Sequence, residues 1–203
     1  MRRSLLLLSA SLVVALFCAP GFARQAAQRP GPTPLRQVAQ PALPEGAASD
    51  WWSKAQAGIQ KEEYSVTWQE QTALQGVGAA WQAPNRAHGF RTYFTEDGIR
   101  VVPRTEQEDA WELGLSLVRS GRAGNLQPVA RPVVSARHNT ADYHRGGISE
   151  WYINDGRGLE QSFRIAAPPD GTGRLALEMA LSGSLHPAFS VDKQAVTFYA
   201  PGR

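Results

Sequence analysis

Cysteine is nearly absent from this chain: among 203 residues only Cys18 carries a thiol. Because Cys18 lies in an N-terminal apolar stretch, the rest of the chain can form no disulfide and no cysteine-ligated metal site. A domain without disulfides depends on its packed hydrophobic core for stability. We therefore expect a chain long enough to bury such a core, and no zinc centre of the cysteine type.

A clustered excess of one charge is also missing. The whole chain has 21 basic and 18 acidic residues. The basic excess lies near the N-terminus, because removing Arg2, Arg3 and the charged residues of 24–48 leaves 16 basic and 17 acidic residues. A nucleic-acid partner would need a clustered basic face, so we expect none.

Recognisable catalytic and metal-binding motifs are absent as well. The sequence has no Gly-x-Ser-x-Gly, no Gly-x-x-x-x-Gly-Lys-Ser/Thr and no His-Glu-x-x-His. Asp142 and His144 could share one strand face, but a zinc site would need at least one more ligand. The other histidines, His88, His138 and His186, are isolated in the sequence. We expect no metal, no cofactor and no enzymatic activity.

The first 23 residues have the layout of a secretory leader. Arg2 and Arg3 precede an apolar stretch over residues 4–18, and Gly21-Phe22-Ala23 supplies small residues at the cleavage positions. The apolar stretch is shorter than a typical membrane span. We expect cleavage after Ala23, a secreted or periplasmic protein, and no membrane span after cleavage. A lipoprotein leader that uses Cys18 is the weaker alternative.

A linker, a short helix and one domain are expected next. Residues 24–48 are rich in proline and alanine, which is typical of an extended, disordered linker. Asp50 can cap a short helix in which Trp52, Ala55 and Ile59 share one face. We expect residues 49–203 to form a single domain, because about 155 residues can bury a core.

Alternating apolar and polar residues predict strands through most of this domain. The pattern centres on 148–165, where Trp151 and Ile153 precede an Asn154-Asp155-Gly156 turn. Nine or ten short strands are expected, with loops at 70–89 and 121–127; the strands lie near 64–68, 90–95, 99–102, 111–117, 129–136, 141–144, 148–153, 159–165, 175–181 and 195–199. We predict a mainly β fold: an antiparallel two-sheet β-sandwich with one short N-terminal helix.

Tryptophan is the main candidate for a ligand site. Trp51, Trp81 and Trp151 could be platforms on which a sugar ring stacks, and Arg157 could stack on a ring or bind a carboxylate. Their ordinary structural roles are core anchors and ion pairs, such as Arg157 with Glu160 or Glu150.

Two carboxylates suggest a weaker, catalytic alternative. Glu150 and Glu160 flank the central hairpin and could form the pair that a glycan hydrolase needs. Charged residues on the outer face of a hairpin are also what solubility alone produces.

Three separated phrases occur in one order along the chain. They are Glu63–Gln69, then Gln82–Ala87 with Phe90–Ile99, then Glu150–Asp155 with Arg157–Phe163. The set resembles the N-terminal region of large secreted bacterial proteins that continue into FG-GAP (integrin-alpha-like) repeats. The resemblance covers about residues 50–200 and implies an extracytoplasmic, β-rich, non-catalytic leading domain. This chain has no such repeats and no calcium loop, so a calcium-dependent propeller function is not implied.

We therefore expect a secreted, non-catalytic β-sandwich that serves as a structural or interaction module. It could be a truncated relative of the FG-GAP repeat proteins, with another extracellular protein or a glycan as partner. A carbohydrate-binding module with exposed tryptophans is the alternative, and a glycan hydrolase is a weaker one. The solvent exposure of the tryptophans separates a binding role from a scaffold role.

Overall fold

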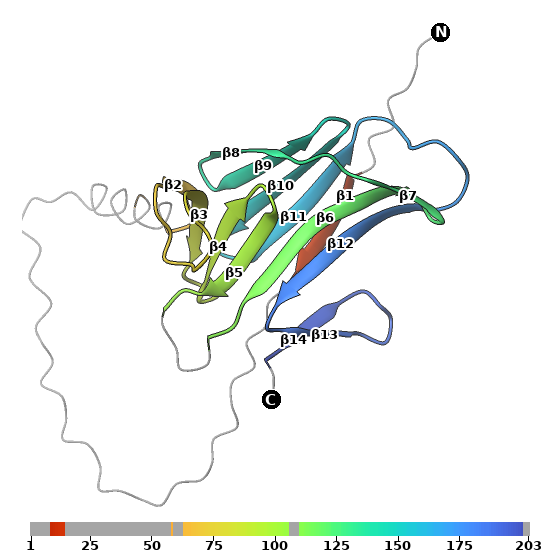
Figure 1. Cartoon of the computed structure of the whole chain (residues 1–203). Coiled ribbons are helices and arrows are strands. Elements are labelled where there is room, and N and C mark those ends of the chain that lie inside the picture. Colours follow the sequence, from red (N-terminus) through yellow and green to blue (C-terminus); the bar gives the residue numbers. More distant parts are fainter. Residues whose placement is uncertain (1–8, 15–57, 59–62, 106–109, 201–203) are drawn as a thin grey trace, which may run out of the picture.

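Two antiparallel sheets and a separate hairpin make up the fold of the described part of the chain (Figure 1). The structure is a computed structural model, and it describes residues 9–14, 58, 63–105 and 110–200. The mainly β, antiparallel class is as predicted. The linker at 24–48 lies outside the described residues, as does nearly all of the helix expected from Asp50. No helix within the described ranges is long and apolar enough to cross a membrane.

The first sheet has five strands in the order β1-β11-β10-β9-β8. The predicted central hairpin forms its middle, with β10 and β11 in register from Ile148↔Ile165 to Asp155↔Gly158. The two-residue turn is therefore Gly156-Arg157, one step beyond the expected position. The strands are β1 (Ser9–Val14), β8 (Val133–Arg137), β9 (Thr140–Arg145), β10 (Ile148–Asp155) and β11 (Gly158–Ile165).

The second sheet follows the order β12-β6-β5-β4-β3-β2, and β7 pairs with the far end of β6. Its strands are β2 (Thr67–Gln69), β3 (Ala80–Asn85), β4 (Phe90–Thr95), β5 (Gly98–Pro103), β6 (Leu113–Arg122), β7 (Asn125–Pro128) and β12 (Leu175–Gly183). A further hairpin, β13 (His186–Phe189) with β14 (Val196–Tyr199), pairs only with itself.

Two stretches predicted as loops are strands. β3 lies within the expected loop at 70–89, and Pro84 is tolerated because β2 pairs only with residues 80–82 of β3. At Pro84 the strand therefore needs no hydrogen bond on that side. The expected loop at 121–127 is instead the hairpin of β6 and β7, in which Arg122 is in register with Asn125. β8 begins directly after Pro132 and is the last strand of its sheet, in keeping with the preference of proline for sheet edges.

The core lies between the inner faces of the two sheets. Phe94 of β4 contacts Tyr152 of β10, with ring centroids 5.6 Å apart, so the two sheets meet directly. Tyr143, Val101 and Leu113 belong to the same buried cluster. A second cluster combines Leu117, Ile148 and Phe163, and Leu177 and Met179 pack against it. This face-to-face packing is that of a β-sandwich.

Strand β10 presents to the core the face opposite to the one that its apolar residues suggest, whereas in β11 the apolar Leu159 and Phe163 face the core as expected. Glu150, Tyr152 and Asn154 are buried, each at 1% exposure, whereas Trp151 and Ile153 are half-buried on the outer face. The expectation that Glu150 lies on the outer face is therefore wrong. The reason is tertiary, since these inward polar side chains find hydrogen-bond partners within the core.

Candidate functional site

The tryptophans proposed as a platform do not share a surface. Trp81 is in register with Phe94, so it lies on the inner side of its sheet and packs against the core. It also meets Trp68 edge to face, with centroids 5.4 Å apart. Trp151 lies on the outer face of the other sheet, beside Asp142 and Ser162 in register. Trp51 lies outside the described residues.

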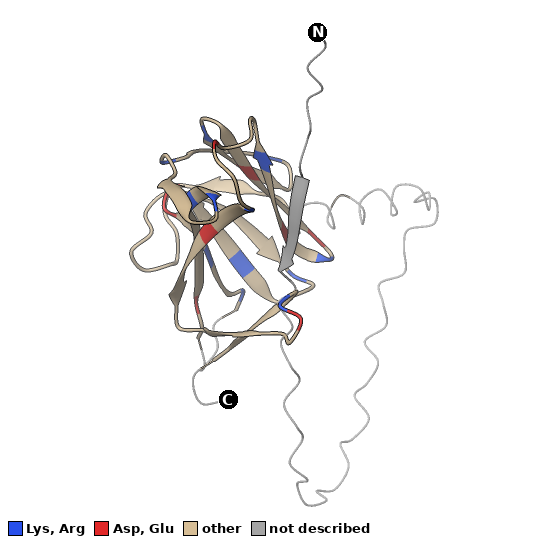
Figure 2. Cartoon of the chain, turned by 90° about the vertical axis from the view of Figure 1, so that its right-hand side faces the viewer, with Lys and Arg blue, Asp and Glu red and all other residues tan. Residues whose placement is uncertain are grey.

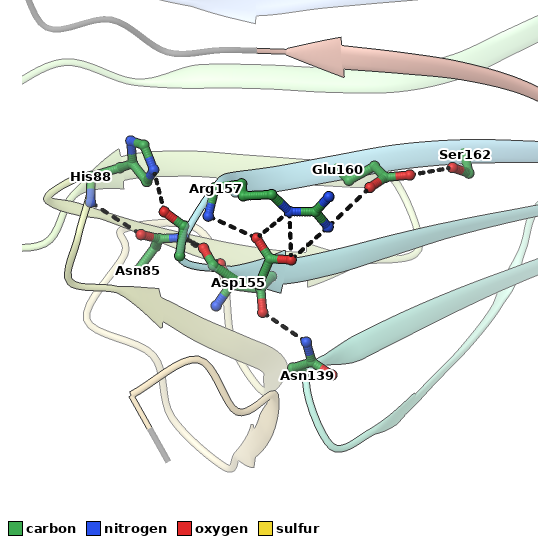
Figure 3. A network of polar contacts seen from close by, with 9 residues as sticks. Asn85, His88, Asn139, Asp155, Arg157, Glu160 and Ser162 are labelled. Atoms are coloured by element: carbon green, nitrogen blue, oxygen red, sulfur yellow. Dashed lines mark hydrogen bonds and ion pairs between the residues drawn. The ribbon is translucent and has the colours of Figure 1, made fainter. Parts of the chain in front are cut away.

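Arg157 is engaged by carboxylates next to the β10–β11 turn (Figure 3). Its guanidinium lies 2.7 Å from Asp155 Oδ2 and 3.6 Å from Glu160 Oε2, so the predicted pair with Glu160 is confirmed. The hydrogen bond from Arg157 lowers the pKa of Asp155 below its usual value. Glu150, the other partner considered for Arg157, pairs with Arg145 instead. Arg157 therefore has a structural role in this turn.

An asparagine cluster fastens the two sheets together at the same end. The Asn85 amide donates to Asn154 Oδ1 and to the Asp155 carbonyl, both at 2.8 Å. The Asn154 amide in turn donates to the carbonyls of Tyr64 at 3.0 Å and Pro84 at 2.7 Å. Asn85 and Asn154 are both buried. The cluster therefore joins β3 to β10 through side-chain amides whose N–H groups all donate within the fold.

A second polar cluster lies deeper, between the sheets. Glu150 Oε1 accepts hydrogen bonds from the Tyr152 hydroxyl and from Gln161 Nε2, and Glu150 Oε2 lies 3.3 Å from Arg145 Nη2. Arg145 also lies over the ring of Tyr143 at 5.4 Å. Burial, followed by the negative charge of Glu150, raises the pKa of both Tyr143 and Tyr152 well above the usual value.

This arrangement does not favour the hydrolase alternative. Glu150 points into the core, whereas Glu160 is in register with Ile153 and lies on the outer face. Two carboxylates on opposite faces of a sheet cannot act across one sugar-binding cleft.

A cleft of about 770 Å³ lies on the outer face of the seven-stranded sheet. Its floor is the outer face of β4 and β5. On this face Arg91 lies beside Val102 and Tyr93 lies beside Arg100 in the strand register. Its walls come from three further segments: Ala73 and Leu74 of the β2–β3 connection, Ala110 to Glu112 before β6, and Gly183 at the end of β12 with Ser184 after it. Tyr93 is covered although it faces outward, since it is 1% exposed.

Two arginines of the cleft have unused donors. The Nε atoms of Arg91 and Arg104 are buried and have no hydrogen-bond acceptor. Neither side chain has an ion pair within the described residues. A buried donor without a partner costs about 1–3 kcal/mol, so an acceptor supplied by a ligand would be favourable here.

A third arginine is already paired and fixes one wall. Arg100 donates from Nε and Nη2 to the two carboxylate oxygens of Glu112, at 2.6 and 2.8 Å. This bond raises the pKa of Arg100 above its usual value. The backbone N–H of Glu112 donates a hydrogen bond to Ser184 Oγ at 3.1 Å. Because Glu112 is paired with Arg100, the positive charges of Arg91 and Arg104 have no counter-charge among the described residues.

The sequence pattern of β4 and β5 already places part of this cleft on one face of the sheet. Arg91 and Tyr93 are two residues apart on a predicted strand, and Arg100 and Val102 are two apart on the next. The turn at Glu96-Asp97-Gly98 pairs these strands, so the four side chains share one face. Leu74, Trp111 and Gly183 also line the cleft. They come from distant parts of the chain, so the spacing of residues along the sequence does not predict that they lie together.

The described residues contain no group of three or more His, Cys, Asp or Glu side chains placed to hold a metal ion. Basic and acidic residues are interspersed over the domain (Figure 2). A scan against family models, a search of curated proteins and a search of solved structures each found no match to the chain.

Proposed function

We propose that this chain is an exported, non-catalytic binding module, and that it binds an acidic glycan in the cleft on the outer face of the seven-stranded sheet. The observation that carries the proposal is the pair of buried, acceptor-free Nε donors of Arg91 and Arg104. Guanidinium groups suit carboxylate and sulfate geometry. The adjoining Val102 and Trp111 supply the apolar and aromatic surface that a sugar ring packs against.

The non-catalytic part of the proposal is supported by the state of the acidic residues. Glu112 is bound by Arg100, and Glu150 is enclosed in the core beside Arg145. A general acid or base must reach the substrate. We therefore expect the chain to bind an acidic oligosaccharide without cleaving it.

The test is titration calorimetry with oligogalacturonate, a sulfated oligosaccharide and a neutral oligosaccharide of similar length. We expect binding of the acidic ligands only, and weakening by about tenfold or more for Arg91→Gln and for Arg104→Gln, since each removes a charge-assisted hydrogen bond. Arg119→Gln is the matched control, because Arg119 is an exposed strand arginine paired with Glu178 away from the cleft. Equal loss in that control, or cleavage of the oligosaccharide, would refute the proposal.

A further variant tests whether the cleft arginines bind a ligand or pair with carboxylates of the same chain. By sequence, the residues between Thr105 and Ala110 include Glu106, Glu108 and Asp109. If these carboxylates are the natural partners of the cleft arginines, E106Q/E108Q/D109N will lower the melting temperature, and the parent chain will bind the acidic glycan much more weakly than this variant. If the cleft serves a ligand, the parent chain will already bind the acidic glycan, and the variant will keep the melting temperature of the parent.

Trp151 supports a second candidate site, for a neutral glycan. It is half-buried on the outer face of the five-stranded sheet, with Asp142 and Ser162 beside it in register. An aromatic ring flanked by acceptors is a common platform for sugars. Binding of the neutral oligosaccharide that Trp151→Ala abolishes, with Trp68→Ala as control, would favour this site over the cleft.

The relationship to FG-GAP proteins stays a prediction. It agrees with an exported β-rich module, and it makes one claim that can be checked without protein chemistry. A continuation of the reading frame into FG-GAP repeats would support it, and an unrelated gene after a stop would count against it.

A further inference from the structure

One edge of the five-stranded sheet is covered by a segment from the predicted leader. β1 runs antiparallel to β11, and its six residues are in register with residues 159–164 (Figure 1). β1 is the outermost strand, so β11 becomes the edge wherever β1 is absent. The sequence predicts removal of residues 1–23 at export. Processing therefore uncovers the hydrogen-bonding edge of β11.

The edge of β11 carries the charged residues Glu160 and Arg164, but it lacks the short length and the adjacent proline that protect the opposite edge of the same sheet. β8 has five residues, begins directly after Pro132, and carries Arg137 with Arg131 close before it. β11 has eight residues from Gly158 to Ile165 and contains no proline. Long edges without proline or a bulge readily pair with another strand.

The inner face of β11 defines the chemistry of that other strand. Leu159, Gln161 and Phe163 are buried toward the core. In β1 the residues in register with them are Val14, Leu12 and Ala10. A fitting strand is thus extended and uncharged, with apolar residues at alternate positions and no proline between them.

We propose that the β11 edge is a strand-docking site. In the unprocessed chain Ser9–Val14 occupies it, and in the processed chain an extended apolar segment of a partner protein adds to the sheet in the same register. Main-chain hydrogen bonds supply the affinity, and the alternate apolar side chains supply the specificity. The proposal depends on the leader prediction and is independent of the cleft and its ligand.

The experiment uses the full chain, with Leu12→Pro to release β1, and a synthetic peptide of residues 8–15 as the probe. Hydrogen exchange of the β11 amides and fluorescence anisotropy of the labelled peptide are measured together. In L12P we expect β11 to lose protection, and the peptide to bind and restore it. The unsubstituted chain should bind the peptide about tenfold or more weakly than L12P does, because β1 occupies its edge. A peptide with proline in place of Leu12 should bind L12P similarly weakly, because it lacks one backbone hydrogen bond to β11.

Amides of β9 and β10 report whether the variant is folded, and the processed protein recovered from an exporting host gives a second open-edge form. Two outcomes overturn the proposal. In the first, β11 exchanges equally with and without L12P, which would mean that β1 does not cover it. In the second, size exclusion shows a dimer with β11 protected and no peptide binding, which would mean that the edge pairs with a second copy.

Discussion

At the residue scale, Asn154 lies where four segments of the chain meet. Its backbone amide donates to the Asn139 carbonyl and its own carbonyl accepts from the Asn139 side chain, both at 2.9 Å. Its side chain reaches Asn85 and the carbonyls of Tyr64 and Pro84. A buried amide with every hydrogen bond satisfied fixes the geometry around it, because any displacement leaves a polar atom without a partner.

Asn154→Ala should therefore be strongly destabilising. It leaves the Tyr64 and Pro84 carbonyls without donors, and we expect a loss of about 2–4 kcal/mol in the free energy of unfolding. Urea unfolding followed by tryptophan fluorescence measures it. Asn125→Ala, at an exposed asparagine of β7, is the control and should change stability by less than about 0.5 kcal/mol. Equal effects of the two substitutions would contradict the role of Asn154.

Asp155 gives a prediction about pH. The hydrogen bond from Arg157 lowers its pKa in the folded state, so the interaction stabilises the fold above the usual pKa of aspartate and is lost as pH falls through the lowered value. Arg157→Gln should raise the pKa of Asp155 toward its usual value, as followed by NMR titration of the carboxyl carbon. Arg131→Gln, which removes an arginine paired with Asp97 elsewhere, should leave it unchanged.

At the scale of elements, the sequence predicted the strands whose alternation is carried by large apolar residues. The β4–β5, β10–β11 and β12 segments are found where they were expected, since Phe, Ile, Leu and Tyr at every second position fit a pleated, half-buried surface. β7 and β13 were missed because their residues are polar or exposed. Their pairing depends on a neighbouring strand, which local spacing does not reveal.

The candidate site was less predictable than the fold. Tryptophan and carboxylates drew attention to Trp151 and Glu150, but alternation alone does not say which face of a strand turns inward. β10 places Glu150, Tyr152 and Asn154 in the core, where side chains of β3, β9 and β11 form hydrogen bonds and an ion pair with them. The cleft around Arg91 and Arg104 is formed by the β2–β3 connection and the end of β12, which are distant in the sequence, so local spacing does not predict it.

Gly183 gives a prediction at this scale, since it ends β12 beside the cleft. Its φ is +100°, and a Cβ placed there would lie 2.2 Å from the carbonyl oxygen of Glu112. Gly183→Ala should lower stability by about 2 kcal/mol or more, and should displace Glu112 and so weaken ligand binding in the cleft. Thermal unfolding and calorimetry report the two effects. Gly147→Ala, where a Cβ meets nothing within 4 Å, should change neither.

At the scale of the whole molecule, stability rests on packing between the sheets without covalent cross-links. A single cysteine cannot form a disulfide within one chain. The thermal midpoint should therefore be unchanged by reductant, both in the parent chain and in Cys18→Ser. A reductant-dependent midpoint in the parent chain that Cys18→Ser abolishes would instead reveal a cross-link between two copies.

The hairpin of β13 and β14 stands apart from this packing (Figure 1). Its strands bond only to each other, Phe189 is 71% exposed, and contact with the main cluster comes through Phe198 and the preceding Leu185. Such a segment has its own local melting equilibrium, with a free energy well below that of global unfolding. During slow warming the molecule should thus unfold in two stages: proteases would cleave the C-terminal hairpin first, while the sandwich still excludes solvent.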